Sequence, residues 1–218
     1  MVLYDTVTMM TKRIGVLALQ GAFAEHIALL NKAIEDNKHD IEVITVKTAP
    51  QLSSCDSLII PGGESTTISL IAKRTGLFDS LIEFVHDPTK TVWGTCAGLI
   101  FLAKQLSNES SLVNSLDLLK VKVRRNAFGR QAESFIETCD FSSFIPDCTG
   151  FQVYFIRAPI IEEILSQDDV ETLYTLKDGS IVAVSQQGRI LGTSFHPELS
   201  DNDARFHNYF IQKFVLNN

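Results

Sequence analysis

Strand-like apolar runs alternate with helix-like segments through the first half of this sequence, and this alternation limits the fold more than any other feature. The run 14–19 is apolar apart from one glycine, as in a strand that is buried on both faces of a sheet. Strands are expected at 14–19, 41–46, 57–60 and 91–93, and helices at 22–37, 65–74, 77–86 and 97–106. Alternation of this kind is typical of a mainly parallel sheet covered by helices. We therefore predict an α/β, single-domain, three-layer fold with a mainly parallel central sheet flanked by helices.

The second half of the sequence is richer in strand-like segments. Strands are expected at 116–125, 133–139, 151–158, 170–176, 181–186 and 190–194, and a last helix at 203–215. The 218 residues include no linker or repeat, and this length suits a single domain. We predict one domain over residues 13–218, preceded by an N-terminal extension of residues 1–12.

Charge and cysteine content exclude several classes of function. The net charge is −7, whereas nucleic acids and anionic membranes need a basic protein face, so neither is an expected partner. No apolar run reaches the ~18 residues that a membrane-spanning helix needs. The four cysteines form no CxxC pair and no zinc-binding pattern with histidine. These observations favour a cytoplasmic protein with reduced cysteines.

A single cysteine lies between two glycines where the strand at 91–93 meets the helix expected after it. The stretch Gly94-Thr95-Cys96-Ala97-Gly98 has the form of a nucleophile elbow, in which a sharp strand-to-helix turn presents a reactive side chain. The positive end of the helix favours the thiolate form of such a cysteine. Cys96 is thus a candidate nucleophile, although a buried structural cysteine in a tight turn remains the alternative.

Two backbone N–H groups are candidates for an oxyanion hole beside this thiol. One belongs to Ala97, directly after the nucleophile, and the other to the glycine loop at Gly63, after the strand at 57–60. Sites in open α/β sheets lie beyond the carboxyl ends of the strands, where both groups are expected. Each such donor typically contributes ~10²–10³ in turnover.

A histidine and a glutamate follow the strand at 190–194. His196 could take the thiol proton and later give it to a leaving amine, and Glu198 could orient the imidazole. Glu198 could otherwise be a solvated loop charge. The remaining histidines lack a paired carboxylate in a comparable context and are interpreted as structural: His26, His39, His86 and His207.

With these motifs the sequence resembles the class I (triad) glutamine amidotransferases and, among them, the glutaminase subunits of pyridoxal 5′-phosphate synthases. The matching stretches are GVLALQGAFAEH (15–26), LIIPGGESTT (58–67), GTCAGLIFLAK (94–104), RNAFGRQAESF (125–135), FIRAP (155–159) and GTSFHPEL (192–199). The resemblance implies hydrolysis of L-glutamine to L-glutamate and ammonia. It also implies a synthase partner that accepts the ammonia for vitamin B6 synthesis, and neither a cofactor nor a metal in this chain.

The resemblance also implies a role for individual residues. Cys96, His196 and Glu198 match the catalytic triad, and Gly63 and Ala97 match the oxyanion-hole amides. The positions that match the glutamine-binding residues are Gly63, Glu64, Ser65, Arg125, Ile156 and Arg157. Structural alternatives remain for several of them, since Arg125 and Arg157 could form surface ion pairs, and Glu64 and Ser65 could cap the helix that follows.

Three other functions stay open at this point. The chain could be a glutaminase that feeds a different amidotransferase pathway. It could be a non-catalytic subunit that only stabilises a partner, although such a protein would normally lose part of the triad. It could also be a redox or stress-response protein with a cysteine elbow in a related fold, which would need no late His-x-Glu.

Overall fold

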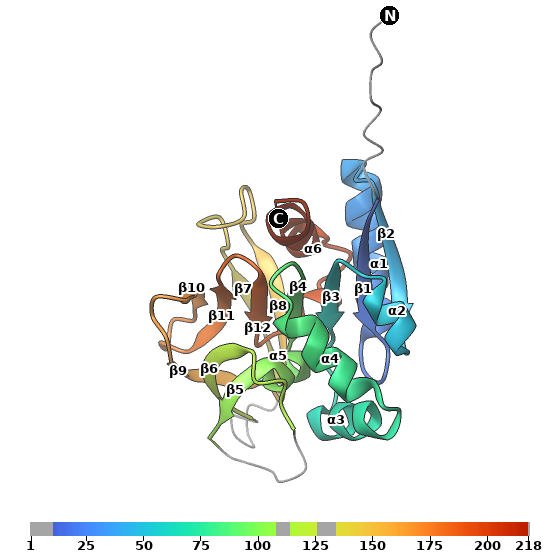
Figure 1. The fold of residues 1–218 in the computed structure, drawn as a ribbon. Helices are drawn as coiled ribbons and strands as arrows, with labels where there is room; N and C mark the ends of the chain where they lie inside the picture. The colour runs from blue at the N-terminus through green and yellow to red at the C-terminus, as the bar shows by residue number, and fades with distance from the viewer. Residues whose placement is uncertain (1–10, 108–113, 126–133, 218) are drawn as a thin grey trace, which may run out of the picture.

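The computed structural model describes residues 11–107, 114–125 and 134–217, and within them a ten-stranded sheet forms the centre of the molecule (Figure 1). The strand order is β2-β1-β3-β4-β12-β11-β9-β6-β5, with β10 paired to β11. The strands of this sheet are β1 (Lys12–Leu17), β2 (Ile41–Val46), β3 (Ser57–Ile60), β4 (Thr91–Thr95), β5 (Ala103–Leu106), β6 (Leu119–Arg124), β9 (Ile160–Ile164), β10 (Val170–Thr175), β11 (Ile181–Gln186) and β12 (Ile190–Thr193).

The two halves of the sheet differ in direction. From β2 to β12 every neighbouring pair is parallel, whereas β11 is antiparallel to β12, β9 and β10, and β9 is antiparallel to β6. β5 and β6 are again parallel. A separate antiparallel hairpin consists of β7 (Ser134–Cys139) and β8 (Phe151–Ile156).

Helices cover both faces of the sheet, so the predicted three-layer α/β fold is confirmed (Figure 1). α2, α3, α4 and α5 contribute to the core on one face, and α1 and α6 contribute to the core on the other, together with the β7–β8 hairpin. The helical segments are α1 (Phe23–Asn37), α2 (Ala49–Ser53), α3 (Ser65–Arg74), α4 (Leu77–His86), α5 (Ala97–Leu102), the 3-10 turn η1 (Pro197–Leu199), α6 (Arg205–Phe210) and the π-helical segment η2 (Ile211–Val215).

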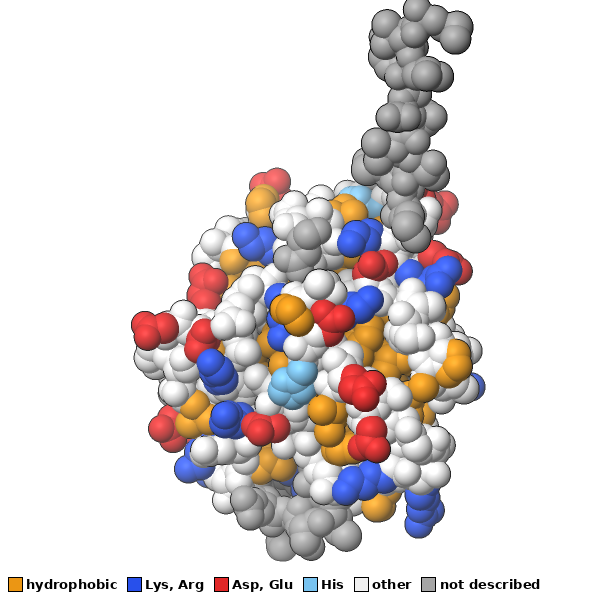
Figure 2. Space-filling model, viewed as in Figure 1, with side chains coloured by type: hydrophobic (Ala, Val, Ile, Leu, Met, Phe, Trp, Pro, Cys, Tyr) orange, Lys and Arg blue, Asp and Glu red, His pale blue; other side chains and the backbone are white. Residues whose placement is uncertain are grey.

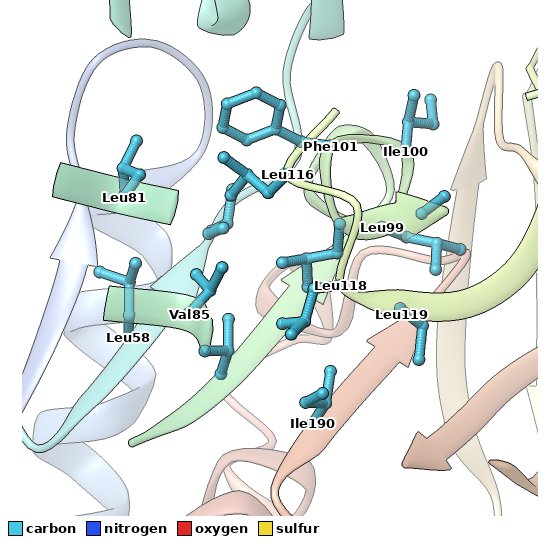
Figure 3. Close-up of a cluster of buried hydrophobic side chains, with 14 of the residues drawn as sticks. Leu58, Leu81, Val85, Leu99, Ile100, Phe101, Leu116, Leu118, Leu119 and Ile190 are labelled. Atoms are coloured by element: carbon cyan, nitrogen blue, oxygen red, sulfur yellow. The ribbon is translucent and has the colours of Figure 1, made fainter. Parts of the chain in front are cut away.

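Alternation along the central strands separates two apolar cores. In β3, Leu58 belongs to the core under α4 and Ile59 to the core under α1, and Val92 and Trp93 of β4 divide in the same way. Figure 3 shows the first core, where side chains of α4 and α5 meet those of β3 and β12. Because successive side chains of a strand point to opposite faces, a continuous apolar run is what a strand between two helical layers requires.

The structure differs from the sequence prediction at several elements. The helix expected at 97–106 ends at Leu102, and Ala103–Leu106 forms β5, which pairs with β6. A short apolar run does not distinguish helix from strand, so periodicity could not place this boundary. The last helix begins at Arg205, and its N–H is bonded to Asp203 Oδ1 (3.1 Å). α2 and β9 were not predicted; the sequence of β9, IIEEI, shows no alternation of period two.

The predicted N-terminal extension lies mostly outside the described residues, and β1 begins at Lys12. No helix in the described ranges is long and apolar enough to span a membrane. On the face shown in Figure 2, acidic and basic side chains of the described residues are interspersed and form no continuous basic patch.

Candidate active site

Cys96 lies at the turn between β4 and α5, at the carboxyl end of the parallel half of the sheet. Its backbone has a φ of 47°, in the left-handed region that residues with a side chain rarely adopt. The Cys96 N–H donates to the Thr193 carbonyl oxygen of β12 (2.8 Å), which ties the turn to the neighbouring strand. The side chain is nearly buried and is held on a fixed, strained turn.

The glycines on either side of Cys96 are required by backbone packing. A Cβ on Gly98 would overlap the carbonyl oxygen of Ile60 in β3, and a Cβ on Gly94 would come within 2.6 Å of the Gly98 backbone. α5 therefore begins in contact with the strands beneath it. The glycine-cysteine-glycine pattern reflects this close approach as well as access to the thiol.

The glycine loop after β3 lies directly against the reactive groups. A Cβ on Gly62 would overlap the imidazole of His196, and it would lie 3.3 Å from Cys96 Cβ. The Gly62 carbonyl oxygen accepts a hydrogen bond from the Ala22 N–H (3.1 Å), and the Glu64 N–H donates to Gln20 Oε1 (2.7 Å). The loop at Gln20 thus holds the glycine loop in one orientation.

His196 and Glu198 lie close together at the end of β12 and in the turn η1. His196 Nδ1 is 2.7 Å from Glu198 Oε1, and the His196 N–H donates to the Tyr154 carbonyl oxygen of β8 (2.9 Å). Burial lowers the pKa of His196, but hydrogen bonds and charges of Cys96 and Glu198 outweigh it and raise the pKa to about 10. These contacts favour the protonated form of the imidazole beside the sulfur.

A cavity of about 350 Å³ opens in front of these groups. Most of the predicted site residues line it: Gly63, Glu64, Ser65, Cys96, Arg125, Ile156, Arg157 and His196. Glu198 does not line the cavity but is buried behind His196. Ala97 is the first residue of α5, directly after the thiol.

Glu64 has a clear structural role. It is the N-cap of α3, and its carboxylate accepts hydrogen bonds from the N–H groups of Thr66 (3.1 Å) and Thr67 (2.7 Å). Burial alone would raise the pKa of Glu64, but these hydrogen bonds lower it. The Arg125 guanidinium lies 3.8 Å from Glu64 Oε1, so a cation and an anion face each other at the rim of the cavity. Ser65 is buried in the first turn of the same helix.

Ile156 and Arg157 form the opposite wall of the cavity, where β8 ends. The Ile156 carbonyl oxygen lies 3.9 Å from Cys96 Sγ, and Arg157 has a φ of 45°. This strand end therefore brings a backbone carbonyl oxygen close to the thiol.

Two histidines that the sequence did not link to the site lie behind the candidate triad. In α1, the Nε2 atom of His26 is 3.3 Å from Glu198 Oε2. Its Nδ1 atom is 2.9 Å from Nε2 of His207 in α6. The sequence offered no carboxylate paired with either histidine in a strand-end context, and the structure places His26 beside Glu198, a residue far away in the sequence. His39 contacts Asn208 Oδ1 and His86 contacts the Leu116 carbonyl oxygen, both away from the cavity.

The other cysteines differ from Cys96 in their surroundings. Cys55, Cys139 and Cys148 are buried in the two cores, and burial raises the pKa of each to about 11. None of the three lines the cavity. At neutral pH they are thiols, which are poor nucleophiles.

Comparisons with known proteins show the family to which the chain belongs. A model of the SNO glutamine amidotransferase family matches residues 16–216. The pyridoxal 5'-phosphate synthase subunit SNO1 of Saccharomyces cerevisiae is 60% identical over 94% of each chain. The pyridoxal 5'-phosphate synthase subunit PdxT of Pyrococcus furiosus is 46% identical over 93% of this chain and 99% of its own. The crystal structure of a glutamine amidotransferase covers 91% of this chain and 97% of its own, with a TM-score of 0.75 and 40% identity.

Proposed function

Since the chain belongs to the SNO glutamine amidotransferase family, we propose that it hydrolyses L-glutamine to L-glutamate and ammonia with Cys96, His196 and Glu198 as its catalytic triad. The ammonia passes to a synthase partner that makes pyridoxal 5′-phosphate, as the names of its relatives suggest. The observation that carries the proposal is the arrangement of a nearly buried thiol and an imidazole at one cavity, with a buried carboxylate bonded to the imidazole from behind.

The first half of the reaction breaks the carbon–nitrogen bond of the glutamine side chain. The Cys96 thiolate attacks the amide carbon and forms a tetrahedral adduct whose oxygen carries the negative charge. The adduct collapses when the His196 imidazolium gives its proton to the leaving nitrogen, which departs as ammonia. The products of this step are a thioester on Cys96 and a neutral His196.

The second half releases glutamate. Neutral His196 takes a proton from water as the water oxygen attacks the thioester carbon, and a second tetrahedral adduct forms. Its collapse expels the Cys96 thiolate next to the His196 imidazolium, so the starting charge state returns. Glu198, bonded to His196 Nδ1, stabilises the imidazolium in both resting and final states.

Backbone N–H groups of Ala97 and Gly63 serve as the oxyanion hole in both steps. Ala97 follows the nucleophile at the start of α5. The Gly62 carbonyl oxygen is bonded to Ala22, and in a trans peptide the N–H of the next residue points the opposite way. Gly63 therefore directs its N–H away from the Gln20–Ala22 loop, and such fixed donors act on the charge that develops in the transition state.

Glutamine binds between the two walls of the cavity. Arg125 pairs with the α-carboxylate, and Glu64 with the α-ammonium, because the two side chains already face each other with opposite charge. Ser65, Ile156 and Arg157 line the remaining surface and contribute backbone and side-chain contacts.

The direct test of this function is ammonia release from glutamine, measured with and without the synthase partner. Cys96→Ala should abolish the release and leave the fold intact. An electrophilic glutamine analogue should modify Cys96 in the wild type, and a Cys139→Ala variant should be modified equally. Modification of Cys55, Cys139 or Cys148 in place of Cys96 would contradict the assignment.

The same proposal places the protein in the cytoplasm. The four cysteines are free and buried, which suits a reducing compartment. A fluorescent fusion or cell fractionation would test this location, and recovery of the active protein from a secreted or organellar fraction would contradict it.

A further inference from the structure

A chain of buried polar groups continues from the candidate triad into the core between α1 and α6. Glu198 uses Oε1 for His196 (2.7 Å), and Oε2 faces His26 Nε2 (3.3 Å). His26 in turn contacts His207 through Nδ1 (2.9 Å). Glu198 has an exposed fraction of 5%, and both histidines are fully buried. Three groups that could each carry charge therefore occupy one apolar region.

Both inner histidines are neutral. Burial lowers the pKa of His207 to about 3, and burial together with the neighbouring His207 and His196 lowers the pKa of His26 well below its usual value. The Trp93 ring packs edge-on against both imidazoles, with centroids 5.5 Å from His26 and 5.1 Å from His207. A second protonated imidazole in these surroundings would be strongly unfavourable.

The hydrogen-bond pattern selects one tautomer for each ring. His207 Nδ1 has no hydrogen-bond partner among the described residues. A proton on that nitrogen would be a buried donor without an acceptor, which is costly, so the proton of His207 belongs on Nε2. It is then donated to His26 Nδ1, and His26 must carry its own proton on Nε2. The hydrogen-bond partner of that nitrogen is Thr95 Oγ1 (3.2 Å). Glu198 Oε2 lies 3.3 Å from the same nitrogen and has no hydrogen-bond partner among the described residues.

We propose that His26 is a positioning residue of the glutaminase: its Nε2–H, 3.3 Å from Glu198 Oε2, attracts this otherwise unpartnered oxygen, and His207 fixes the tautomer that places the proton there. The inference rests on the proposed function. Attraction of Oε2 to the His26 N–H favours the orientation in which Glu198 Oε1 is bonded to His196, so His196 stays aligned with Cys96. His26 touches neither the substrate cavity nor the sulfur, so it acts through Glu198 alone.

This position predicts a specific kinetic signature. Loss of the His26 N–H should lower kcat roughly ten- to a hundredfold, the range expected when a buried charged group loses its polar neighbour. KM for glutamine should stay unchanged, because His26 lines no part of the cavity. A general loss of folded protein would instead lower the fraction of active sites and leave kcat per active site unchanged.

The experiment compares four variants in the complex with the synthase. His26→Phe keeps the ring volume and removes the donor, and His26→Gln offers an amide N–H near the position of Nε2. His207→Phe leaves His26 in place but removes the group that fixes its tautomer, so we expect a smaller loss, about threefold to tenfold. His39→Phe is the matched control, because His39 lies after the end of α1 and contacts Asn208 Oδ1 (2.8 Å) away from the cavity. Rates are normalised to Cys96 modified by the electrophilic analogue, which counts folded sites.

A double-mutant cycle with Glu198→Ala decides whether His26 acts through Glu198. In that background His26→Phe should change kcat less than about threefold, because the group it holds is gone. Recovery of most of the rate in His26→Gln supports the same conclusion. Two outcomes would overturn the inference and leave the proposed function standing. One is an equal effect of His26→Phe with and without Glu198, and the other is an unchanged kcat of His26→Phe beside an active wild type. A wild-type complex that releases no ammonia from glutamine would overturn the proposed function and the inference together.

Discussion

The two sides of the candidate site are held in place in different ways. Cys96 is fixed by the backbone: its φ is 47°, its N–H is bonded to β12, and Gly98 packs against the carbonyl oxygen of Ile60. His196 is fixed by side chains, through Glu198 and the buried histidine behind it. Steric contact therefore defines the nucleophile, and a hydrogen-bond network defines the base.

This difference predicts how each side responds to substitution. Backbone contacts leave no room for an added atom, so a change on the nucleophile side affects the fold itself. A hydrogen-bond network can lose one member and keep its shape, so a change on the base side affects the rate in graded steps. Substitutions on the nucleophile side should therefore lower stability, and substitutions on the base side should mainly lower turnover.

Among substitutions that keep the Cys96 thiol, the largest expected effect on turnover comes from the base. His196→Asn removes the proton donor for ammonia and the acceptor for water, and we expect kcat to fall by ~10²–10⁴. The melting temperature should change little, because the backbone bond from His196 N–H to Tyr154 remains. Steady-state ammonia release and thermal unfolding of the same preparation test this, and a wild-type rate would rule out His196 as the base.

The nucleophile side should show the opposite behaviour. Gly98→Ala places a Cβ onto the Ile60 carbonyl oxygen, and overpacking of this kind costs about 1–3 kcal/mol of stability. For a chain of this size we expect a fall in melting temperature of about 2–12 °C. Turnover should fall as well, because the elbow must shift.

Gly150→Ala is the matched control for this clash. Gly150 has a φ of 64°, and a Cβ there would meet nothing within 4 Å, so only the backbone strain of about 1–2 kcal/mol is introduced. Gly150→Ala should therefore keep full turnover per folded site. If Gly98→Ala also keeps full turnover per folded site, the packing at Gly98 does not define the position of the nucleophile.

The contrast between the two sides also explains which site residues the sequence indicates. The glycines around Cys96 are close to it in sequence, and His196 and Glu198 are close to each other, so local patterns are enough to identify them. His26 lies in α1, and it meets Glu198 only when the chain has folded. No spacing rule predicts such a contact, so the sequence alone favours a structural interpretation of His26.

The fold shows the same division. The parallel half of the sheet consists of apolar runs that the sequence marks clearly, and β2, β3, α3 and α4 have the expected bounds. Errors occur where periodicity is ambiguous: α5 is shorter than predicted and β9 was missed. These elements lie in or next to the antiparallel half, where strand pairing and not local propensity decides the conformation.

Substrate binding in the cavity can be changed without altering the nucleophile side or the base side of the site. Arg125→Lys keeps the charge but loses the paired N–H bonds that hold a carboxylate. We expect kcat/KM to fall about tenfold or more, mostly through KM, because a charged hydrogen bond contributes about 1.5–3 kcal/mol. Cys96 should still react with a small alkylating agent at the wild-type rate.

A glutamine analogue with an amide in place of the α-carboxylate separates recognition from ion pairing. The wild type should discriminate strongly against it, and Arg125→Lys much less. Equal discrimination by the two enzymes would mean that Arg125 serves only its contact with Glu64 (3.8 Å).

The smallest expected effect is a change in pH dependence when the charge of Glu198 is removed. The pKa of His196 is raised to about 10, with Cys96 and Glu198 both raising it against the effect of burial. Glu198→Gln removes one of the two favourable charges, so the pKa of His196 should fall. Because the imidazolium must be present to protonate ammonia, activity is lost when pH rises through this pKa. The alkaline limb of kcat/KM should therefore move to lower pH, by about one unit for ~1.4 kcal/mol of lost stabilisation. The α-ammonium of glutamine also titrates in this range, but it does so equally for both enzymes and cancels in the comparison. An unmoved alkaline limb would mean that Glu198 orients His196 without stabilising its charge, and the base side would then be held by geometry, as the nucleophile side is.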